Sequence, residues 1–284
     1  MKIRQIAVVL IALLAAAVIV GCGGTSTDNE KTSGSIVFDS TNTTTDLRII
    51  FGTGVNQQLF QANGREPSFR RDGQVIAFIG AFDVDANDIF AYNVCIINSD
   101  GTGLVELTDN AESADPTVSN PAVSPDGEKV AYVTGGAIHL VDADGANDAQ
   151  LVADAYNPAF SPDGEQIAFV RVSDIFTINL DDKVETNVTN NTSGDLVSSP
   201  EFSPSGDEIV YALHTTIMLL DIAGATQEDI VTNGAHPTFK PDATRIAFVR
   251  DNMIYSVNIA GTDLQQLTTV TDQVHNNPSW AATP

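Results

Sequence analysis

Short apolar runs alternate with polar turns along this chain, and one such unit occurs five times. Each copy has a proline, an aromatic or apolar residue, a polar turn, and then a run of β-branched or aromatic residues. The copies read PSFRRDGQVIAF from Pro67, PAVSPDGEKVAY from Pro121, PAFSPDGEQIAF from Pro158, PEFSPSGDEIVY from Pro200 and PTFKPDATRIAF from Pro237. In all five copies the apolar run opens nine residues after the proline. Internal repetition at roughly 40 residues is typical of propellers, solenoids and other arrays.

Each unit carries four strand signals. In the third copy these are residues 158–160, 167–170 and 174–178, with a fourth strand ending near Val188. The Ser-Pro-Asp-Gly sequence between the first two is a turn, because proline presets φ and glycine tolerates a positive φ. Four short strands in about 40 residues are the pattern of a propeller blade.

The two ends of the chain supply complementary parts of one further blade. A sixth first strand begins at Pro278, and the chain ends soon after it. Three unassigned strands are predicted at residues 35–38, 46–50 and 57–60, and residues 54–59 resemble residues 262–267. The sequence therefore predicts an all-β, six-bladed β-propeller over residues 35–284, closed by three N-terminal strands and one C-terminal strand that share a blade. Such closure removes free sheet edges.

These repeats resemble a known family. PAFSPDGEQIAFV from Pro158, followed by DIFTINL from Asp174, resembles the PD40 repeat, also called the WD40-like TolB repeat. The resemblance covers about residues 35–284 and implies a six-bladed propeller. TolB itself carries an α/β domain before its propeller, whereas only a short polar segment precedes the first predicted strand here. The resemblance therefore does not by itself imply a role in a Tol system.

Residues 1–21 have the pattern of a lipoprotein signal peptide. Lys2 and Arg4 precede an apolar stretch over residues 6–20, and residues 18–22 resemble the bacterial lipobox, which ends in the cysteine that becomes lipidated. The alternative is an ordinary signal peptide in which Cys22 is incidental. We expect export, an acyl anchor on Cys22, and a flexible tether over residues 22–34. The protein would then be a monomer anchored to the bacterial membrane, at the periplasmic side of the outer membrane or at the cell surface.

The charge of the chain restricts its partners. There are 13 basic residues and 37 acidic ones, a net charge of −24. Nucleic acids and anionic membrane surfaces select basic patches, so neither is an expected partner, and membrane contact is expected through the lipid anchor only. The acidity favours a cationic partner or serves solubility alone. Cys95 lies in an apolar run and is expected to be a buried, inert thiol.

The residues before the six prolines are the candidate binding residues. All six are polar and are expected to surround the mouth of the central channel: Glu66, Asn120, Asn157, Ser199, His236 and Asn277. Two expanded connections, between Ile76 and Asp88 and between Leu107 and Pro121, fall on the same face. Loop-rich faces of rigid scaffolds often carry binding sites. Alternatively, Asn and Ser precede proline for local reasons, because they initiate turns.

Two groups of residues are candidates for a metal site. The first comprises three histidines on the same face, His214, His236 and His275. The second is the carboxylate cluster Asp83, Asp85 and Asp88, which resembles the start of a calcium loop but lacks the glycine and glutamate of an EF-hand. No cofactor is expected, and Ca²⁺ or another divalent cation is the one candidate left open.

Enzyme signatures are absent from the sequence: there is no Gly-x-Ser-x-Gly, His-Glu-x-x-His, P-loop or Gly-x-Gly-x-x-Gly motif. The sequence therefore favours a non-catalytic binding scaffold for a protein or a cell-envelope polymer. One alternative is a metal-dependent, glycan-active enzyme of the lyase type that uses the loop histidines. A purely structural envelope module is the other.

Overall fold

The computed structural model describes residues 34–41, 45–51, 57–61, 63–83, 90–109, 118–191, 194–269 and 273–282. All regular elements in these ranges are β-strands, as the alternating pattern predicts. The described part of the chain accordingly contains no helix long and apolar enough to cross a membrane. The predicted signal peptide, Cys22 and residues 22–33 of the predicted tether lie outside the described residues.

The strands form six four-stranded antiparallel sheets, each of which is a blade. The shared blade has the order β24-β1-β2-β3, with β24 (Val274–Ala281), β1 (Ser35–Thr41), β2 (Thr45–Phe51) and β3 (Gln57–Gln61). The second blade contains β4 (Gly64–Phe69), β5 (Val75–Asp83), β6 (Phe90–Asn98) and β7 (Val105–Glu106). The third contains β8 (Ser119–Val123), β9 (Lys129–Thr134), β10 (Ala137–Asp142) and β11 (Ala149–Ala153).

The other three blades follow the same order from the innermost strand outwards. The fourth contains β12 (Tyr156–Phe160), β13 (Gln166–Arg171), β14 (Asp174–Asn179) and β15 (Glu185–Asn187). The fifth contains β16 (Val197–Phe202), β17 (Glu208–Leu213), β18 (Thr216–Asp221) and β19 (Thr226–Thr232). The sixth contains β20 (Ala235–Phe239), β21 (Arg245–Arg250), β22 (Met253–Asn258) and β23 (Gln265–Gln266).

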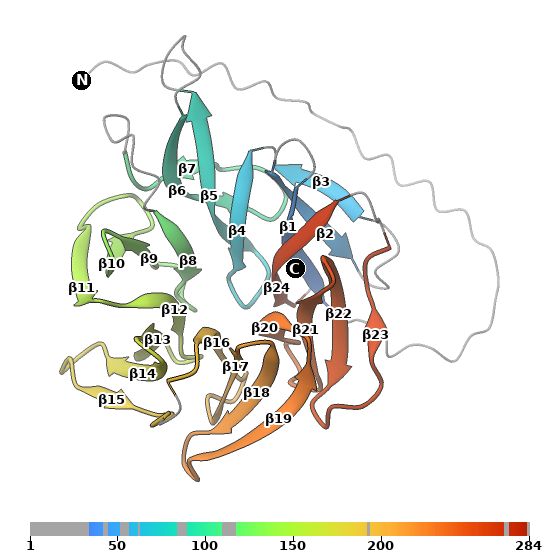
Figure 1. Cartoon of the computed structure of the whole chain (residues 1–284). Coiled ribbons are helices and arrows are strands. Elements are labelled where there is room, and N and C mark those ends of the chain that lie inside the picture. Colours follow the sequence, from blue (N-terminus) through green and yellow to red (C-terminus); the bar gives the residue numbers. More distant parts are fainter. Residues whose placement is uncertain are drawn as a thin grey trace. The chain divides into compact units, whose positions relative to one another are not determined.

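The shared blade confirms the predicted closure. The C-terminal strand β24 pairs with β1, so that Ile36 lies opposite Trp280 and Ser35 lies opposite Ala281 (Figure 1). Gly34 precedes this pairing with a φ of 143°, and a Cβ there would lie 2.6 Å from the carbonyl oxygen of Ala281 and 2.7 Å from Nε1 of Trp280. A glycine is therefore required where the two ends of the propeller meet.

The hydrophobic core lies between neighbouring blades. Six apolar clusters each join residues of two adjacent blades. In the cluster at the closure, Phe38 and Trp280 of the shared blade are grouped with Ile254 of the sixth blade. The second strand of each blade is buried on both sides, which explains its nearly continuous apolar sequence.

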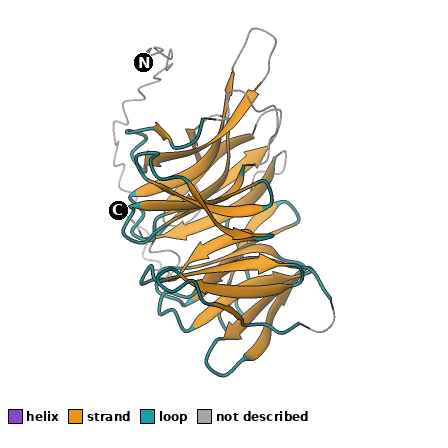
Figure 2. Ribbon diagram, turned by 90° about the vertical axis from the view of Figure 1, so that its left-hand side faces the viewer, coloured by secondary structure: helices purple, strands orange, loops and turns teal. Residues whose placement is uncertain are grey.

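The propeller has two faces with different connections. Short turns join the first strand to the second and the third to the fourth on one face, here called the turn face. The connections after the second and fourth strands lie on the other, here called the mouth face. Strands run between these two faces, with the loops at their ends (Figure 2). On the mouth face, Val172 is 87% exposed and has a φ of 57°, a conformation that β-branched residues rarely adopt.

Candidate binding channel

Every innermost strand is irregular at the residue before its proline. The antiparallel register shifts there in all six blades. All six of these residues have a positive φ between 47° and 52°: Glu66, Asn120, Asn157, Ser199, His236 and Asn277. Proline cannot donate to the ladder, so a bulge is the place where a sheet accommodates it. Asparagine and histidine occur in this backbone region more often than most residues, whereas glutamate and serine enter it at a cost.

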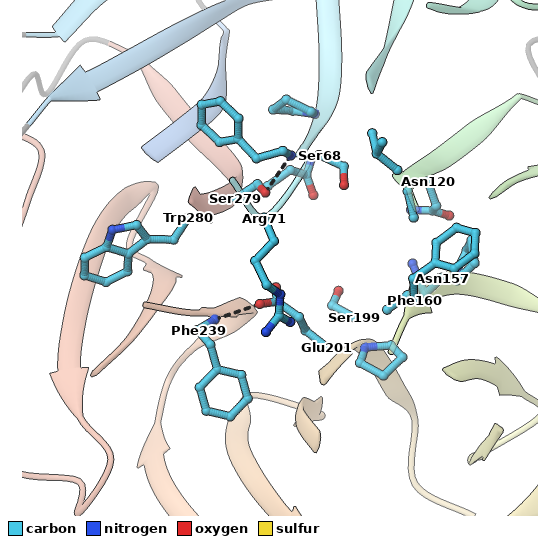
Figure 3. Close-up of a pocket in the computed structure, with 18 of the residues that line it drawn as sticks. Ser68, Arg71, Asn120, Asn157, Phe160, Ser199, Glu201, Phe239, Ser279 and Trp280 are labelled. Carbon is cyan, nitrogen blue, oxygen red and sulfur yellow. Dashed lines mark hydrogen bonds between the residues drawn. The ribbon is translucent and has the colours of Figure 1, made fainter. Parts of the chain in front are cut away.

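The six bulged residues line a single cavity of about 190 Å³ along the channel. The prolines that follow them line the same cavity, together with the small residues Ser68, Ala122 and Ala159. Asn120, Asn157 and Ser199 lie around the channel (Figure 3). The structure thus brings together all six candidate binding residues of the sequence analysis. Their role in binding a ligand stays a prediction.

Hydrogen bonds connect the channel residues across the closure. The carboxylate of Asp39, on β1, accepts a bond from the backbone N–H of Glu66 at 3.0 Å and another from Nδ2 of Asn277 at 2.8 Å. Glu66 in turn accepts a bond from the backbone N–H of Asn120 at 2.6 Å. Three consecutive blades are therefore linked through two carboxylates. On the opposite side of the ring, the Ser199 hydroxyl and Nδ1 of His236 lie 3.1 Å apart.

Burial shifts the pKa of two of the six candidate residues. It raises the pKa of Glu66, with a smaller contribution in the same direction from Asp39, while the Asn120 N–H and Arg65 act in the opposite direction. Burial also lowers the pKa of His236, and Asp39 partly offsets this effect. The neutral forms of both side chains are thus favoured more than in water.

A second pair of charged residues lies deeper in the channel. Arg71, in the turn after β4, donates a hydrogen bond from Nη2 to the carbonyl oxygen of Phe202, on β16 of the fifth blade, at 3.2 Å. Its guanidinium points towards Glu201 (Figure 3). Burial raises the pKa of Glu201 to about 7, against the lowering effects of Arg71, the Phe239 N–H and the Thr238 hydroxyl.

The metal candidates are not brought together in the described residues. Nε2 of His214 lies 2.8 Å from Asp195 at the surface, and His236 contacts Ser199 in the channel. His275 is fully buried, with Nδ1 2.9 Å from the Thr268 hydroxyl. Within the described ranges, no group of three or more His, Cys, Asp or Glu side chains is placed to hold a metal ion. Of the carboxylate cluster, Asp85 and Asp88 lie outside these ranges, and only the backbone of Asp83 is described.

Three residues of the channel were not predicted from the sequence, and each departs from the repeat. Asp39 occupies the second-strand position that is apolar in the other blades: Ile79, Val133, Val170, Ala212 and Val249. Arg71 replaces the turn proline found at Pro125, Pro162, Pro204 and Pro241. Glu201 replaces a small residue, as at Ser68, Ala122, Ala159, Thr238 and Ser279. Aligning the repeats position by position, and asking which copy carries a charge, would have found all three.

The family model described as the TolB beta propeller domain matches residues 134–283. Among solved structures, the chain is similar to TolB from Acinetobacter baumannii, with a TM-score of 0.75 and 16% identity over 88% of this chain and 67% of that one. It is also similar to a putative TolB from Agrobacterium tumefaciens, with a TM-score of 0.63 and 14% identity over 89% of this chain and 100% of that one.

A third similar structure comes from a nidogen/laminin complex, with a TM-score of 0.71 and 10% identity over 87% of this chain and 98% of that one. No curated protein matches the sequence. At these identities the structural similarities establish the propeller fold and nothing further, since one fold hosts many functions.

Proposed function

Because the chain belongs to the TolB β-propeller domain family, we propose that it is an exported, lipid-anchored scaffold that binds a protein segment at the channel mouth without catalysis. The observation that carries this proposal is the ring of six bulged residues that line one cavity. Left-handed backbone at non-glycine residues is costly and clusters at functional sites. All six blades carry a hydrogen-bonding side chain at this position: asparagine in three of them, and Ser199, His236 and Glu66 in the others.

The surroundings of the ring support a protein partner. Three exposed apolar residues lie on the mouth face of the fourth and fifth blades: Tyr156, Val172 and Leu196. An aromatic residue beside polar, preformed backbone is a common anchor at protein interfaces. One of the similar structures is itself part of a protein–protein complex, that of nidogen and laminin. The net charge of −24 favours a partner with a basic surface.

The partner can be identified by photocrosslinking in the cell envelope. Tyr156 is 48% exposed next to Asn157, and benzoylphenylalanine resembles tyrosine in shape, so Tyr156 is a suitable position for the crosslinker. Val184, exposed on the turn face, is the matched control position. We expect a specific protein adduct from position 156 and none from position 184. Polysaccharide adducts, or the same adducts from both positions, would contradict a protein site at the mouth.

Affinity for that partner should depend on several ring residues. Glycine is the appropriate truncation, because it removes the side chain and tolerates a positive φ. We expect Glu66→Gly, Asn157→Gly and His236→Gly each to weaken binding by about 1–2 kcal/mol, without an all-or-none loss. Isothermal titration calorimetry measures this loss. Asn147→Gly is the control, because Asn147 has a similar positive φ, 54°, in an exposed turn on the other face. Equal losses in the control would mean that the ring is not the site.

The lipid anchor is proposed on the sequence of residues 18–22. Two or three acyl chains hold a protein stably on a membrane, whereas one does so only marginally. We expect Cys22→Ser to abolish incorporation of labelled palmitate and to move the protein out of the membrane fraction. Cys95→Ala is the control, because Cys95 is buried and burial raises the pKa of its thiol to about 12, so that it is unreactive. Equal labelling of wild type and Cys22→Ser would exclude this anchor.

A further inference from the structure

Arg71 crosses the channel from one side to the other. The innermost strands of neighbouring blades contact one another in the order β24, β4, β8, β12, β16 and β20, and β20 contacts β24. The second and fifth blades are therefore opposite in the ring. Arg71 leaves the second blade just after β4, and its Nη2 binds the Phe202 carbonyl oxygen of the fifth. Four other blades have proline at this position, whereas the second blade has an arginine whose charged side chain extends across the channel.

The carboxylate opposite Arg71 is already engaged by its neighbours. Glu201 accepts a hydrogen bond from the backbone N–H of Phe239 at 3.0 Å. Ser279 plays the same part at another blade junction, where its hydroxyl accepts a bond from the Phe69 N–H at 2.9 Å. Glu201 thus replaces a small hydroxyl residue as the acceptor between blades. The ion pairs among the described residues do not include Arg71.

One guanidinium nitrogen of Arg71 is a hydrogen-bond donor that is not used within the described residues. Nη1 is buried, and within the described residues it has no hydrogen-bond partner. Buried polar groups in folded proteins are nearly always hydrogen-bonded, so an unmatched donor in a cavity indicates a missing acceptor. At the level of Glu201, the third and fourth blades present only Ala122 and Ala159, which also line the cavity. Room therefore exists beside the guanidinium for a small group with a negative charge.

We propose that the channel binds a carboxylate, with Arg71 as the residue that recognises it. Arginine suits this role because its planar fork matches the two oxygens of a carboxylate and its charge persists on burial. The aliphatic part of the ligand lies against Ala122, Ala159 and the channel prolines. This inference goes beyond the proposed function, because a small carboxylate needs no macromolecular partner. The carboxylate is that of a free organic acid or that of a partner chain.

A titration of the purified protein with sodium acetate tests the site. The backbone amide resonances are followed at constant ionic strength, and acetamide serves as the neutral molecule of the same shape. We expect saturable shifts with acetate, centred on Ala159, Phe202 and Phe239, and none with acetamide. Arg71→Met should weaken acetate binding at least tenfold. Arg70→Met is the matched control, because Arg70 is the adjacent arginine and pairs with Asp72 at the surface, at 2.6 Å.

A second variant keeps the test valid if Arg71→Met fails to fold. Glu201→Gln leaves the guanidinium in place and removes the carboxylate whose charge acts on it, so acetate should bind severalfold more tightly. Titration with the tripeptide Ala-Ala-Ala and its C-terminal amide distinguishes the two sources. Tighter binding of the free-acid peptide than of acetate assigns the ligand to a chain terminus, and the reverse assigns it to a free organic acid.

The proposal is overturned if acetate produces no saturable shift in either wild type or Glu201→Gln, or if Arg71→Met and wild type respond alike. In that case the role of Arg71 is to join two opposite blades through its hydrogen bond to Phe202, and its replacement changes only the free energy of unfolding. The photocrosslinking at Tyr156 does not depend on this outcome, so the two proposals fail separately.

Discussion

Trp280→Ala is expected to lower the free energy of unfolding by about 3–5 kcal/mol, the usual cost of removing a large aromatic side chain from a core. Trp280 is 5% exposed and belongs to the apolar cluster that joins the sixth blade to the shared blade. It lies on β24, the C-terminal strand that completes the shared blade. The loss therefore weakens the packing of the strand that closes the ring. Urea denaturation followed by circular dichroism measures the change.

Three further variants serve as references for the size of this effect. Trp280→Phe keeps most of the packed volume and should cost less than the alanine variant. Leu264→Ala removes an apolar side chain that is 45% exposed, and it should change stability by no more than about 0.5 kcal/mol. A chain that ends before Val274 lacks β24 altogether and should not fold cooperatively. An unchanged denaturation midpoint in Trp280→Ala would show that β24 contributes little to closure.

Glu201 is expected to make the stability of the propeller fall as the pH rises from about 4.5 to about 7. Burial raises the pKa of Glu201 in the folded protein to about 7, above the ordinary value of 4.5. Between these values the folded state binds more protons than the unfolded state, so the free energy of unfolding decreases with pH. The stabilisation is complete below the unfolded pKa and is lost as the pH passes the folded one. The full effect is on the order of 3 kcal/mol.

Comparison with Glu201→Gln isolates this contribution from that of other groups. His236 acts in the opposite direction, because its lowered pKa makes stability rise with pH below about 6.5. We expect chemical denaturation at pH 5 and pH 8 to show this difference. The free energy of unfolding of Glu201→Gln, relative to that of wild type, should be higher at pH 8 than at pH 5. Glu165→Gln, at an exposed turn position, is the control and should show little pH-dependent difference. A constant difference between wild type and Glu201→Gln would contradict an uncharged Glu201 at low pH.

The architecture of this protein follows from its sequence, because the residues that specify a blade are close together along the chain. Proline, turn and apolar run recur at fixed spacing from Pro67 to Pro237, and each copy builds the same four strands. Counting first strands to Pro278 predicts six blades, and the unpaired strands near Ser35 predict the shared one. The positions of Glu66 and its five counterparts around one channel follow from the same repetition, since equivalent residues of equivalent blades lie at equivalent heights.

The contacts among the channel residues, in contrast, depend on the tertiary structure. A residue before proline is usually extended, and the sequence does not reveal that all six adopt a left-handed backbone at a bulge. The contact of Asp39 with Glu66 and Asn277 joins the two ends of the chain, and the reach of Arg71 to Phe202 spans two opposite blades. The three histidines share a face in the sequence pattern, yet they differ in burial and in neighbours. Such relations depend on ring closure and side-chain direction, which are properties of the whole propeller and of no single repeat.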